Sequence, residues 1–235
     1  MSKAIVEFIN VTKKYGEKDA VQLANNDVSF TIDEGEFVVI LGQSGAGKST
    51  VLNMLGGMDI PTSGKVIVAG QEVSAMNDKE LSAYRADTIG FIFQFYNLLP
   101  SLTALENVAL TKNIVKNAGD PLKMLEAVGL GNHKNKFPAQ MSGGEQQRVS
   151  IARALAKNPK IILGDEPTGA LDSETGVIVL ELLQKLSRED KKTVILVTHN
   201  ADIAKCADKV IRMKNGKIRE IKINDNPVPV REVEW

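Results

Sequence analysis

The sequence lacks cysteine pairs and excess positive charge, features that several protein classes require. It contains one cysteine, Cys206, in 235 residues, which excludes an intramolecular disulfide and favours a reducing compartment. A small buried side chain is the simpler interpretation of that cysteine. Lysine plus arginine equals aspartate plus glutamate at 29 each. No net positive charge therefore favours nucleic acid as a partner, although the balance leaves room for a local basic patch.

Long hydrophobic runs are also absent. No stretch approaches the ~20 apolar residues that a membrane-spanning helix needs, and the first residues lack the apolar centre of a secretory signal. We therefore expect any work at a membrane to be done as a peripheral partner. Hydrophobic side chains make up 43% of the chain, enough to bury the core of one domain, or of a domain with a subdomain.

One glycine-rich stretch carries the clearest chemistry. It matches G-x-x-x-x-G-K-[ST] and consists of Gly42, Gln43, Ser44, Gly45, Ala46, Gly47, Lys48, Ser49 and Thr50. The apolar run 37–41 before it is typical of a buried parallel strand, and the pattern after it is helical. Such a turn directs backbone N–H groups and the positive end of a helix dipole at an anion. Lys48 suits the β- and γ-phosphates and Ser49 suits Mg²⁺, whereas a chance glycine-rich turn is the weaker alternative.

Polar side chains end three other predicted core strands. Gln94 ends one, the pair Asp165 and Glu166 ends a second, and His199 ends a third. Ligands bind outside the carboxyl ends of parallel strands, so these residues are candidates for one site. Asp165 is suited to holding Mg²⁺ and Glu166 to polarising a water molecule. The alternatives are solvated loop acids, an ordinary strand end and a structural histidine.

Residues 95–157 change from strand to helix signals. Capping boxes at residues 103–106 and 142–145 open two of the predicted helices, and we interpret the segment as a small helical subdomain. Gly143 and Gly144 leave the start of the second helix without side chains, which favours a second anion site. A single well-capped helix is the alternative.

The sequence predicts extended structure at both ends of the chain. Residues 4–11 form a strand-like segment followed by a polar stretch, which places Tyr15 on a loop, where it either packs locally or supports a purine ring. Strict alternation over residues 28–33 predicts an antiparallel strand with one wet face. Asn215-Gly216 predicts a hairpin. The tail ends at Trp235, which either docks on a partner or makes no contact.

The order of these motifs resembles that of the ATP-binding subunit of an ABC transporter. The resemblance covers residues 3 to about 223, and its motifs are highly specific in combination. It implies an α/β fold: a P-loop NTPase (RecA-like) core with a parallel sheet, an antiparallel β subdomain and a helical subdomain. Residues 1–94 and 158–224 would form the core with the β subdomain, residues 95–157 the helical subdomain, and residues 225–235 an extended tail.

The resemblance also implies partners and residue roles. Two copies would meet head to tail and sandwich two ATP molecules with Mg²⁺. Within one copy, the resemblance implies that Tyr15 stacks on adenine and that residues 42–50 form the Walker A loop. Ser49, Gln94 and Asp165 would lie at Mg²⁺ or its water. Glu166 would be the general base, and His199 would contact the γ-phosphate. Across the interface, Ser142, Gly143, Gly144 and Gln146 of the signature segment would act in trans, and Asp172 would lie in the D-loop.

A finer resemblance is to the branch of macrolide exporters, lipoprotein-release and cell-division proteins, the MacB, LolD and FtsE type. It rests on residues 93–100, 102–108 and 165–172. It implies a separate membrane protein with few transmembrane helices and a large extracytoplasmic domain, and a place at the cytoplasmic face of the membrane. Export of peptide, antibiotic or lipid-like cargo and a regulatory clamp on a cell-wall complex are both compatible with it. A DNA-repair ABC ATPase is disfavoured, because residues 95–140 lack sustained heptads.

Overall fold

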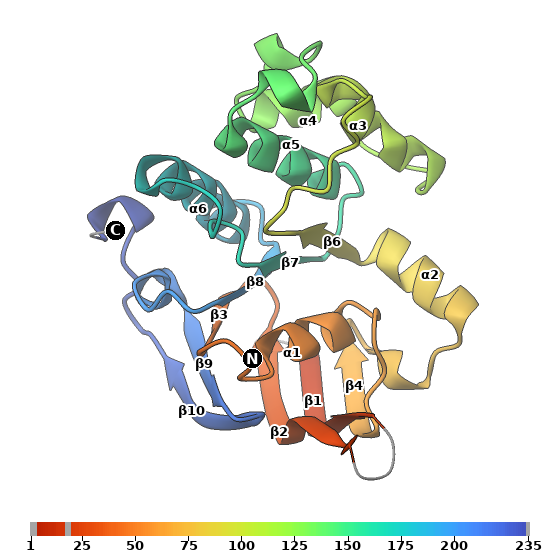
Figure 1. Cartoon of the computed structure of the whole chain (residues 1–235), viewed down its shortest axis with the longest axis vertical. Helices are drawn as coiled ribbons and strands as arrows, with labels where there is room; N and C mark the ends of the chain where they lie inside the picture. Colours follow the sequence, from red (N-terminus) through yellow and green to blue (C-terminus); the bar gives the residue numbers. More distant parts are fainter. Residues whose placement is uncertain (1–3, 17–19, 234–235) are drawn as a thin grey trace.

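The computed structural model describes residues 4–16 and 20–233, which build two sheets with helices around them (Figure 1). The central sheet has the strand order β10-β9-β3-β8-β7-β6. Its strands are β3 (Phe37–Leu41), β6 (Ile89–Ile92), β7 (Ile161–Asp165), β8 (Thr193–Thr198), β9 (Lys209–Lys214) and β10 (Lys217–Ile223). All neighbours pair in parallel except β10, which is antiparallel to β9.

Strand β3 is buried along its whole length because the central sheet is covered on both faces. Val38 and Ile40 belong to one hydrophobic core, with helix α1 (Lys48–Leu55) and the second sheet. Val39 points into the other core, which includes helices α5 (Gly143–Leu155) and α6 (Ser173–Arg188). Figure 1 shows α1 and α6 on opposite sides of the sheet. The predicted buried parallel strand is confirmed.

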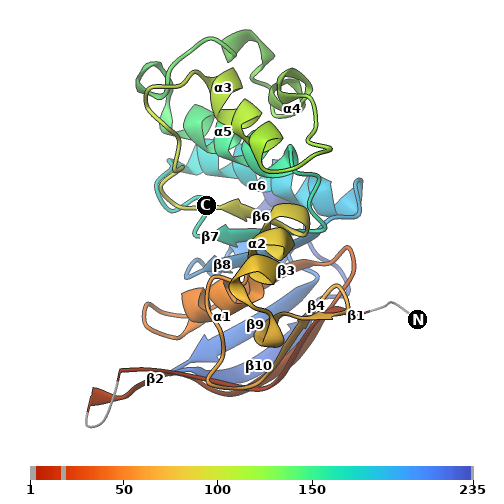
Figure 2. The ribbon, with the colours of Figure 1, turned by 90° about the vertical axis from the view of Figure 1, so that its right-hand side faces the viewer.

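The second sheet is antiparallel, with the order β2-β1-β4-β5. Its strands are β1 (Ala4–Tyr15), β2 (Gln22–Asp33), β4 (Ser63–Val68) and β5 (Gln71–Glu72). The predicted alternation in β2 is present, since Val28, Phe30 and Ile32 are buried between exposed neighbours. Figure 2 shows the β1–β2 hairpin projecting from the body of the molecule.

The placement of Tyr15 on a loop is wrong. Strand β1 continues past the polar residues after Val11, and Tyr15 pairs with Gln22 of β2. Backbone pairing needs no apolar side chains, so the hairpin extends beyond the point where the hydrophobic alternation stops.

The capping boxes predicted at residues 103–106 and 142–145 are confirmed. Helix α2 (Asp78–Asp87), helix α3 (Ala104–Ala109) and α5 each begin with a complete capping box, at Asn77, Thr103 and Ser142 respectively. Helix α4 (Pro121–Ala127) begins after Asp120, and α3, α4 and α5 lie together at one end of the molecule (Figures 1 and 2). None of the described helices is long and apolar enough to span a membrane. The division at residues 95, 158 and 225 stays a prediction.

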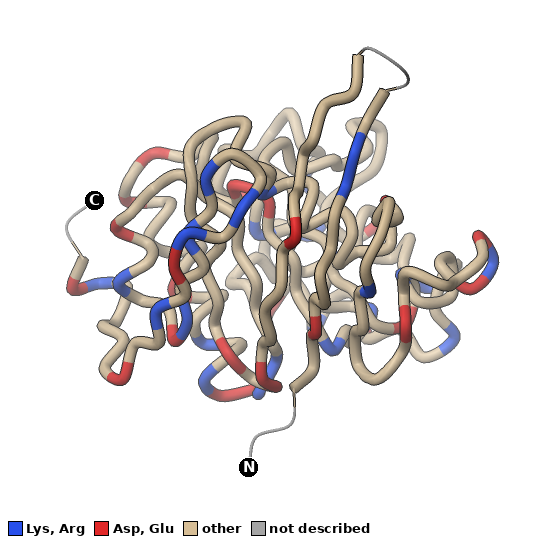
Figure 3. The backbone as a smooth tube through the Cα atoms, turned by 90° about the horizontal axis from the view of Figure 1, so that it is seen from below, with Lys and Arg blue, Asp and Glu red and all other residues tan. Residues whose placement is uncertain are grey.

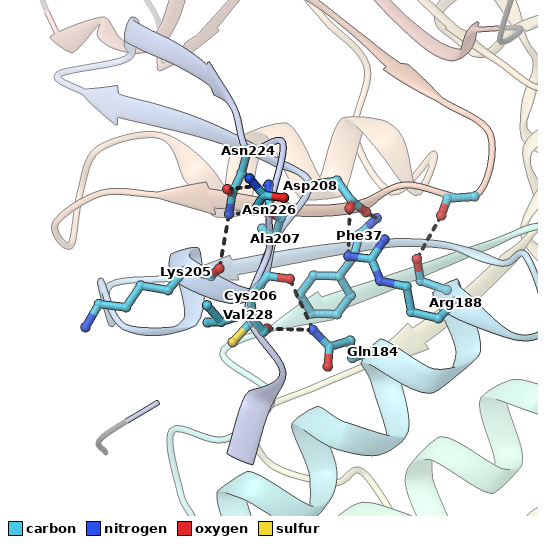
Figure 4. Close-up of polar contacts among 12 residues, drawn as sticks. Phe37, Gln184, Arg188, Lys205, Cys206, Ala207, Asp208, Asn224, Asn226 and Val228 are labelled. Carbon is cyan, nitrogen blue, oxygen red and sulfur yellow. Dashed lines mark hydrogen bonds and ion pairs between the residues drawn. The ribbon is translucent and has the colours of Figure 1, made fainter. Parts of the chain in front are cut away.

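The chain after β10 packs back onto α6 (Figure 4). The Gln184 Nε2 atom donates to the carbonyl oxygens of Cys206 and Val228 at 3.3 and 3.2 Å, and Gln184 Oε1 accepts from Val230 N–H. Cys206 is fully buried, and burial raises the pKa of its thiol to about 11, as expected for a small core side chain. Trp235 lies outside the described residues.

Basic and acidic residues are intermingled over the face of the molecule seen from below (Figure 3), in keeping with the equal counts of the two charges.

Candidate nucleotide-binding site

A cavity of about 800 Å³ opens at the carboxyl ends of the parallel strands. Strands β3, β8, β7 and β6 are consecutive neighbours in the sheet, so the residues that follow them reach one place. The lining consists of Tyr15, Gln22, Leu23, Ala24, residues 43–50, Gln94, Asp165, Glu166 and His199. The structure therefore brings together the glycine-rich loop and all the strand-ending polar residues that the sequence singled out.

The glycine-rich loop is pressed against β2. Gly47 has a left-handed backbone with φ of 93°, and a Cβ atom added there would lie 2.4 Å from the carbonyl oxygen of Ala24. The Asn25 side chain is fully buried and its Nδ2 atom donates to Gly47 O at 3.2 Å. Only glycine fits at position 47.

The other side of the loop rests on the β9–β10 hairpin. A Cβ atom at Gly42 would lie 2.5 Å from the carbonyl oxygen of Met213, and Gly216 N–H donates to Ala46 O at 3.1 Å. The predicted hairpin at Asn215-Gly216 is confirmed. The β9–β10 hairpin thus braces the glycine-rich loop on the side that does not face β2.

The start of α1 is arranged for an anion. Gly47 caps the helix without a side chain, and the first turn contains no acidic residue. The positive end of the helix dipole thus stays uncompensated by the chain itself. Lys48 is buried, and its Nζ atom donates to Gln43 O at 3.1 Å, which holds the ammonium group over its own loop.

Asp165 and Ser49 form the part of the cavity that suits a divalent cation. The Ser49 Oγ atom donates to Asp165 Oδ1 at 3.3 Å. Burial raises the pKa of Asp165, the Ser49 hydrogen bond opposes this, and the charge of neighbouring Glu166 raises the pKa further. A half-buried carboxylate whose charged form is disfavoured gains from a nearby cation, and hard oxygen donors are what Mg²⁺ prefers.

Glu166 has two hydrogen-bond partners at the end of β8. Its Oε2 atom accepts from Thr198 Oγ1 at 2.9 Å, and its Oε1 atom is 2.8 Å from His199 Nδ1. The backbone of Glu166 is left-handed, with φ of 44°, a conformation that the surroundings must hold in place. The His199 ring is largely exposed, so it reaches the cavity while one contact orients it.

Tyr15 stands at the rim of the cavity on the β1–β2 hairpin. Its hydroxyl donates to Asp59 Oδ2, and Asp59 also pairs with Lys13, whose Nζ atom lies 4.9 Å from the centre of the Tyr15 ring. Burial and the hydrogen bond to Asp59 raise the pKa of Tyr15. These contacts fix the position of the partly exposed ring at the rim of the cavity.

The signature segment lies outside this cavity. Ser142 caps α5, and the Ser142 N–H donates to Glu145 Oε2 at 2.8 Å. A Cβ atom at Gly144 would lie 1.8 Å from Thr175 Cγ2, so glycine is required where α5 meets the start of α6. Asp172 caps α6 by accepting from Thr175 N–H. None of Ser142, Gly143, Gly144, Gln146 and Asp172 lines the cavity.

Three polar residues near the site were not predicted. They are Asn25 under the loop, Asp59 at the tyrosine, and Gln147 on α5, which donates to the carbonyl oxygen of Pro167. No spacing in the sequence distinguishes them from surface residues, because their partners lie far away in the chain.

Comparisons with known proteins agree with this geometry. A family model described as ABC transporter matches residues 25–169. The ABC transporter ATP-binding protein MJ0796 of Methanocaldococcus jannaschii is 47% identical over 93% of this chain and 97% of its own. LolD of Xanthomonas oryzae, the ATP-binding protein of a lipoprotein-releasing system, is 42% identical over 93% of this chain and 91% of its own. A Mycoplasma pneumoniae relative is 45% identical, but this chain spans only half of its length.

A solved structure shows the same fold in two copies. It is described as the dimeric post-hydrolysis state of the MJ0796 cassette bound to ADP and Pi, and it matches with a TM-score of 0.85 at 44% identity over 93% of this chain and 98% of that one. The predicted fold class is thereby confirmed, and so is the resemblance to the branch that contains LolD. The chain belongs to the ABC transporter family and is an ATP-binding cassette, an ATPase that works with Mg²⁺.

Proposed function

We propose that this chain powers a membrane complex as a head-to-tail homodimer in which each ATP is held between the phosphate loop of one copy and the signature segment of the other. One observation carries the proposal: apart from Gly42, the cavity gathers the phosphate, cation and base residues predicted within one chain, but the signature segment of the same chain lies outside it. A second copy would supply that segment. Dimeric structures of the MJ0796 cassette support the arrangement.

Within that site, the chain's own residues have distinct tasks. Lys48 and the N–H groups of the loop bind phosphate, and Ser49 and Asp165 hold the cation with help from Gln94. Bound Mg²⁺ would neutralise charge on the phosphate oxygens. Glu166 orients the attacking water and takes its proton on a carboxylate oxygen.

A mixing experiment tests the shared site. Lys48→Ala removes the phosphate contact of its own site, and Ser142→Arg blocks the contribution to the other site, so each variant alone is expected to be nearly inactive. An equal mixture should regain up to roughly a quarter of wild-type ATPase activity, the value for sites that act independently, because half of the dimers are mixed and each of these has one intact site. Activity is measured by phosphate release after co-refolding or subunit exchange, and thermal unfolding checks that both variants are folded.

Two results would count against the shared site. One is full activity of Ser142→Arg alone, and the other is no recovery in mixtures shown by native mass spectrometry to contain mixed dimers.

The proposed partner is an integral membrane protein with few transmembrane helices and a large extracytoplasmic domain, contacted from the cytoplasmic face. Phe95, directly after Gln94, is 73% exposed, and Leu99 is 47% exposed, so an apolar surface adjoins a residue of the ATP site. Neighbouring exposed apolar side chains mark interaction surfaces more often than single ones do. The name of LolD supports release or export of lipid-modified cargo.

Capture from detergent-solubilised native membranes tests the partner. Glu166→Gln protein with ATP is expected to retain a few-helix membrane protein, and adding Phe95→Ser should lower its recovery several-fold through loss of apolar contact. Ile114→Ser is the matched control, since Ile114 is 62% exposed and is not beside Gln94. Retention of a many-helix permease instead would keep the ATPase and discard the proposed kind of partner.

A further inference from the structure

Gln147 joins the signature helix to both loops that flank the proposed catalytic residues. It lies on the second turn of α5 and its side chain is 0% exposed. Its Nε2 atom donates to the carbonyl oxygen of Pro167 at 2.7 Å and to that of Phe93 at 3.3 Å. Pro167 follows Glu166 directly, and Phe93 directly precedes Gln94. One amide group therefore holds the backbone next to both residues.

A role in packing alone does not explain this side chain. The Gln147 Oε1 atom is buried and has no hydrogen-bond partner within residues 4–16 and 20–233. An unsatisfied buried acceptor destabilises the folded chain, and an apolar side chain of the same size avoids that cost. A glutamine at this position is therefore better explained by its two donated hydrogen bonds than by the space it fills.

The first turn of α5 is tied to the rest of the dimer-facing surface. Gly144 packs so closely on Thr175 that a Cβ atom would lie 1.8 Å from Thr175 Cγ2. The Thr175 hydroxyl donates to Asp172 Oδ2 at 2.9 Å. The signature segment and the D-loop are thus joined at the start of α5, and Gln147 lies one turn further along the same rigid helix.

We propose that Gln147 is a positioning residue that links the signature segment of a chain to Glu166 and Gln94 of that same chain. When α5 engages the ATP held by the partner copy, Gln147 transmits the displacement of α5 to the backbone at Pro167 and Phe93. Hydrolysis in one site then depends on the occupancy of the other. The inference rests on the homodimer and on the roles proposed above for Glu166 and Gln94.

Gln147→Met tests the link, because methionine has about the length and volume of glutamine but donates no hydrogen bond. We expect kcat for ATP hydrolysis to fall about tenfold or more, KM for ATP to stay within about twofold, and the Hill coefficient for ATP to fall toward 1. Gln147→Asn keeps the donor but has a shorter reach, so it should give an intermediate kcat. That variant keeps the test decisive if the methionine variant does not fold.

Gln184→Met is the matched control. Gln184 also donates from a helix to two backbone carbonyl oxygens, those of Cys206 and Val228 (Figure 4), and none of these three residues lines the nucleotide cavity. It should keep the wild-type kcat and Hill coefficient, whatever its effect on the thermal unfolding midpoint.

The proposal is overturned if Gln147→Met and Gln147→Asn retain wild-type kcat and Hill coefficient, or if the Gln147 and Gln184 variants lose kcat alike in proportion to lost stability. Failure of the proposed catalytic roles is seen separately, as wild-type turnover of Glu166→Gln with Gln147 intact.

Discussion

Replacing Glu166 by glutamine is expected to lower kcat for ATP hydrolysis by about 10²- to 10⁴-fold, the usual contribution of a general base, while ATP affinity stays within about twofold of wild type. The glutamine has the same shape, and the phosphate loop does not contact it through any hydrogen bond found in the structure. Binding and turnover should therefore separate.

Besides removing a charge, the substitution of Glu166 changes the hydrogen bonds with its neighbours. The Thr198 hydroxyl donates to one carboxylate oxygen, and His199 Nδ1 lies at the other. An amide has one acceptor oxygen and one NH₂ donor group, so the NH₂ group of the new glutamine donates either to the Thr198 hydroxyl oxygen or to an unprotonated His199 Nδ1. NMR of labelled histidine distinguishes these two arrangements.

Single-turnover kinetics and size-exclusion chromatography with ATP measure the effect on the whole protein. Glu166→Gln should elute as a stable dimer when ATP is present, since bound ATP is no longer consumed. Glu189→Gln, an exposed glutamate at the end of α6, is the control and should behave as wild type. Wild-type turnover of the Glu166 variant would refute its role as the base.

Replacing Lys48 by alanine is expected to act on binding instead. A charged hydrogen bond contributes about 1.5–3 kcal/mol, so ATP affinity should weaken roughly 10- to 100-fold. The loop itself should persist, because the contacts with Asn25, Met213 and Gly216 that hold it do not involve the lysine side chain.

Calorimetric titration with ATP in the presence of EDTA isolates this effect from hydrolysis. Lys65→Ala is the matched control, because Lys65 is exposed and pairs only with Glu72 in the salt bridges of the described residues. Equal affinity of the Lys48 variant and wild type would contradict the placement of its ammonium group at the phosphates.

The parts of the fold that the sequence predicts well are those with local causes. Residues 37–41 are apolar throughout because both faces of β3 are buried, and Ser142 with Glu145 forms a capping box because both lie within one helical turn. The glycine-rich loop belongs to the same class. Its function follows from backbone geometry between a strand and a helix, which a short stretch of sequence encodes.

The parts that it predicts poorly depend on distant partners. Tyr15 looked like a loop residue because the polar side chains around it hide a strand that exists through pairing with β2. Asn25, Asp59 and Gln147 are ordinary polar residues until the fold brings Gly47, Tyr15 and Pro167 to them. The signature segment shows a further limit, since its proposed ligand lies on another copy of the chain.

The hairpin that braces the phosphate loop also affects when a newly made chain can first load ATP. The loop leaves the ribosome early, but the N–H of Gly216 that holds Ala46 belongs to the turn between β9 and β10, which is synthesised much later. At about 5–20 residues per second, roughly ten to thirty seconds separate the two segments. Nascent chains stalled before β9 should therefore bind nucleotide poorly, and synthesis past β10 becomes a condition for occupancy. Incompletely synthesised chains then do not dimerise through bound ATP.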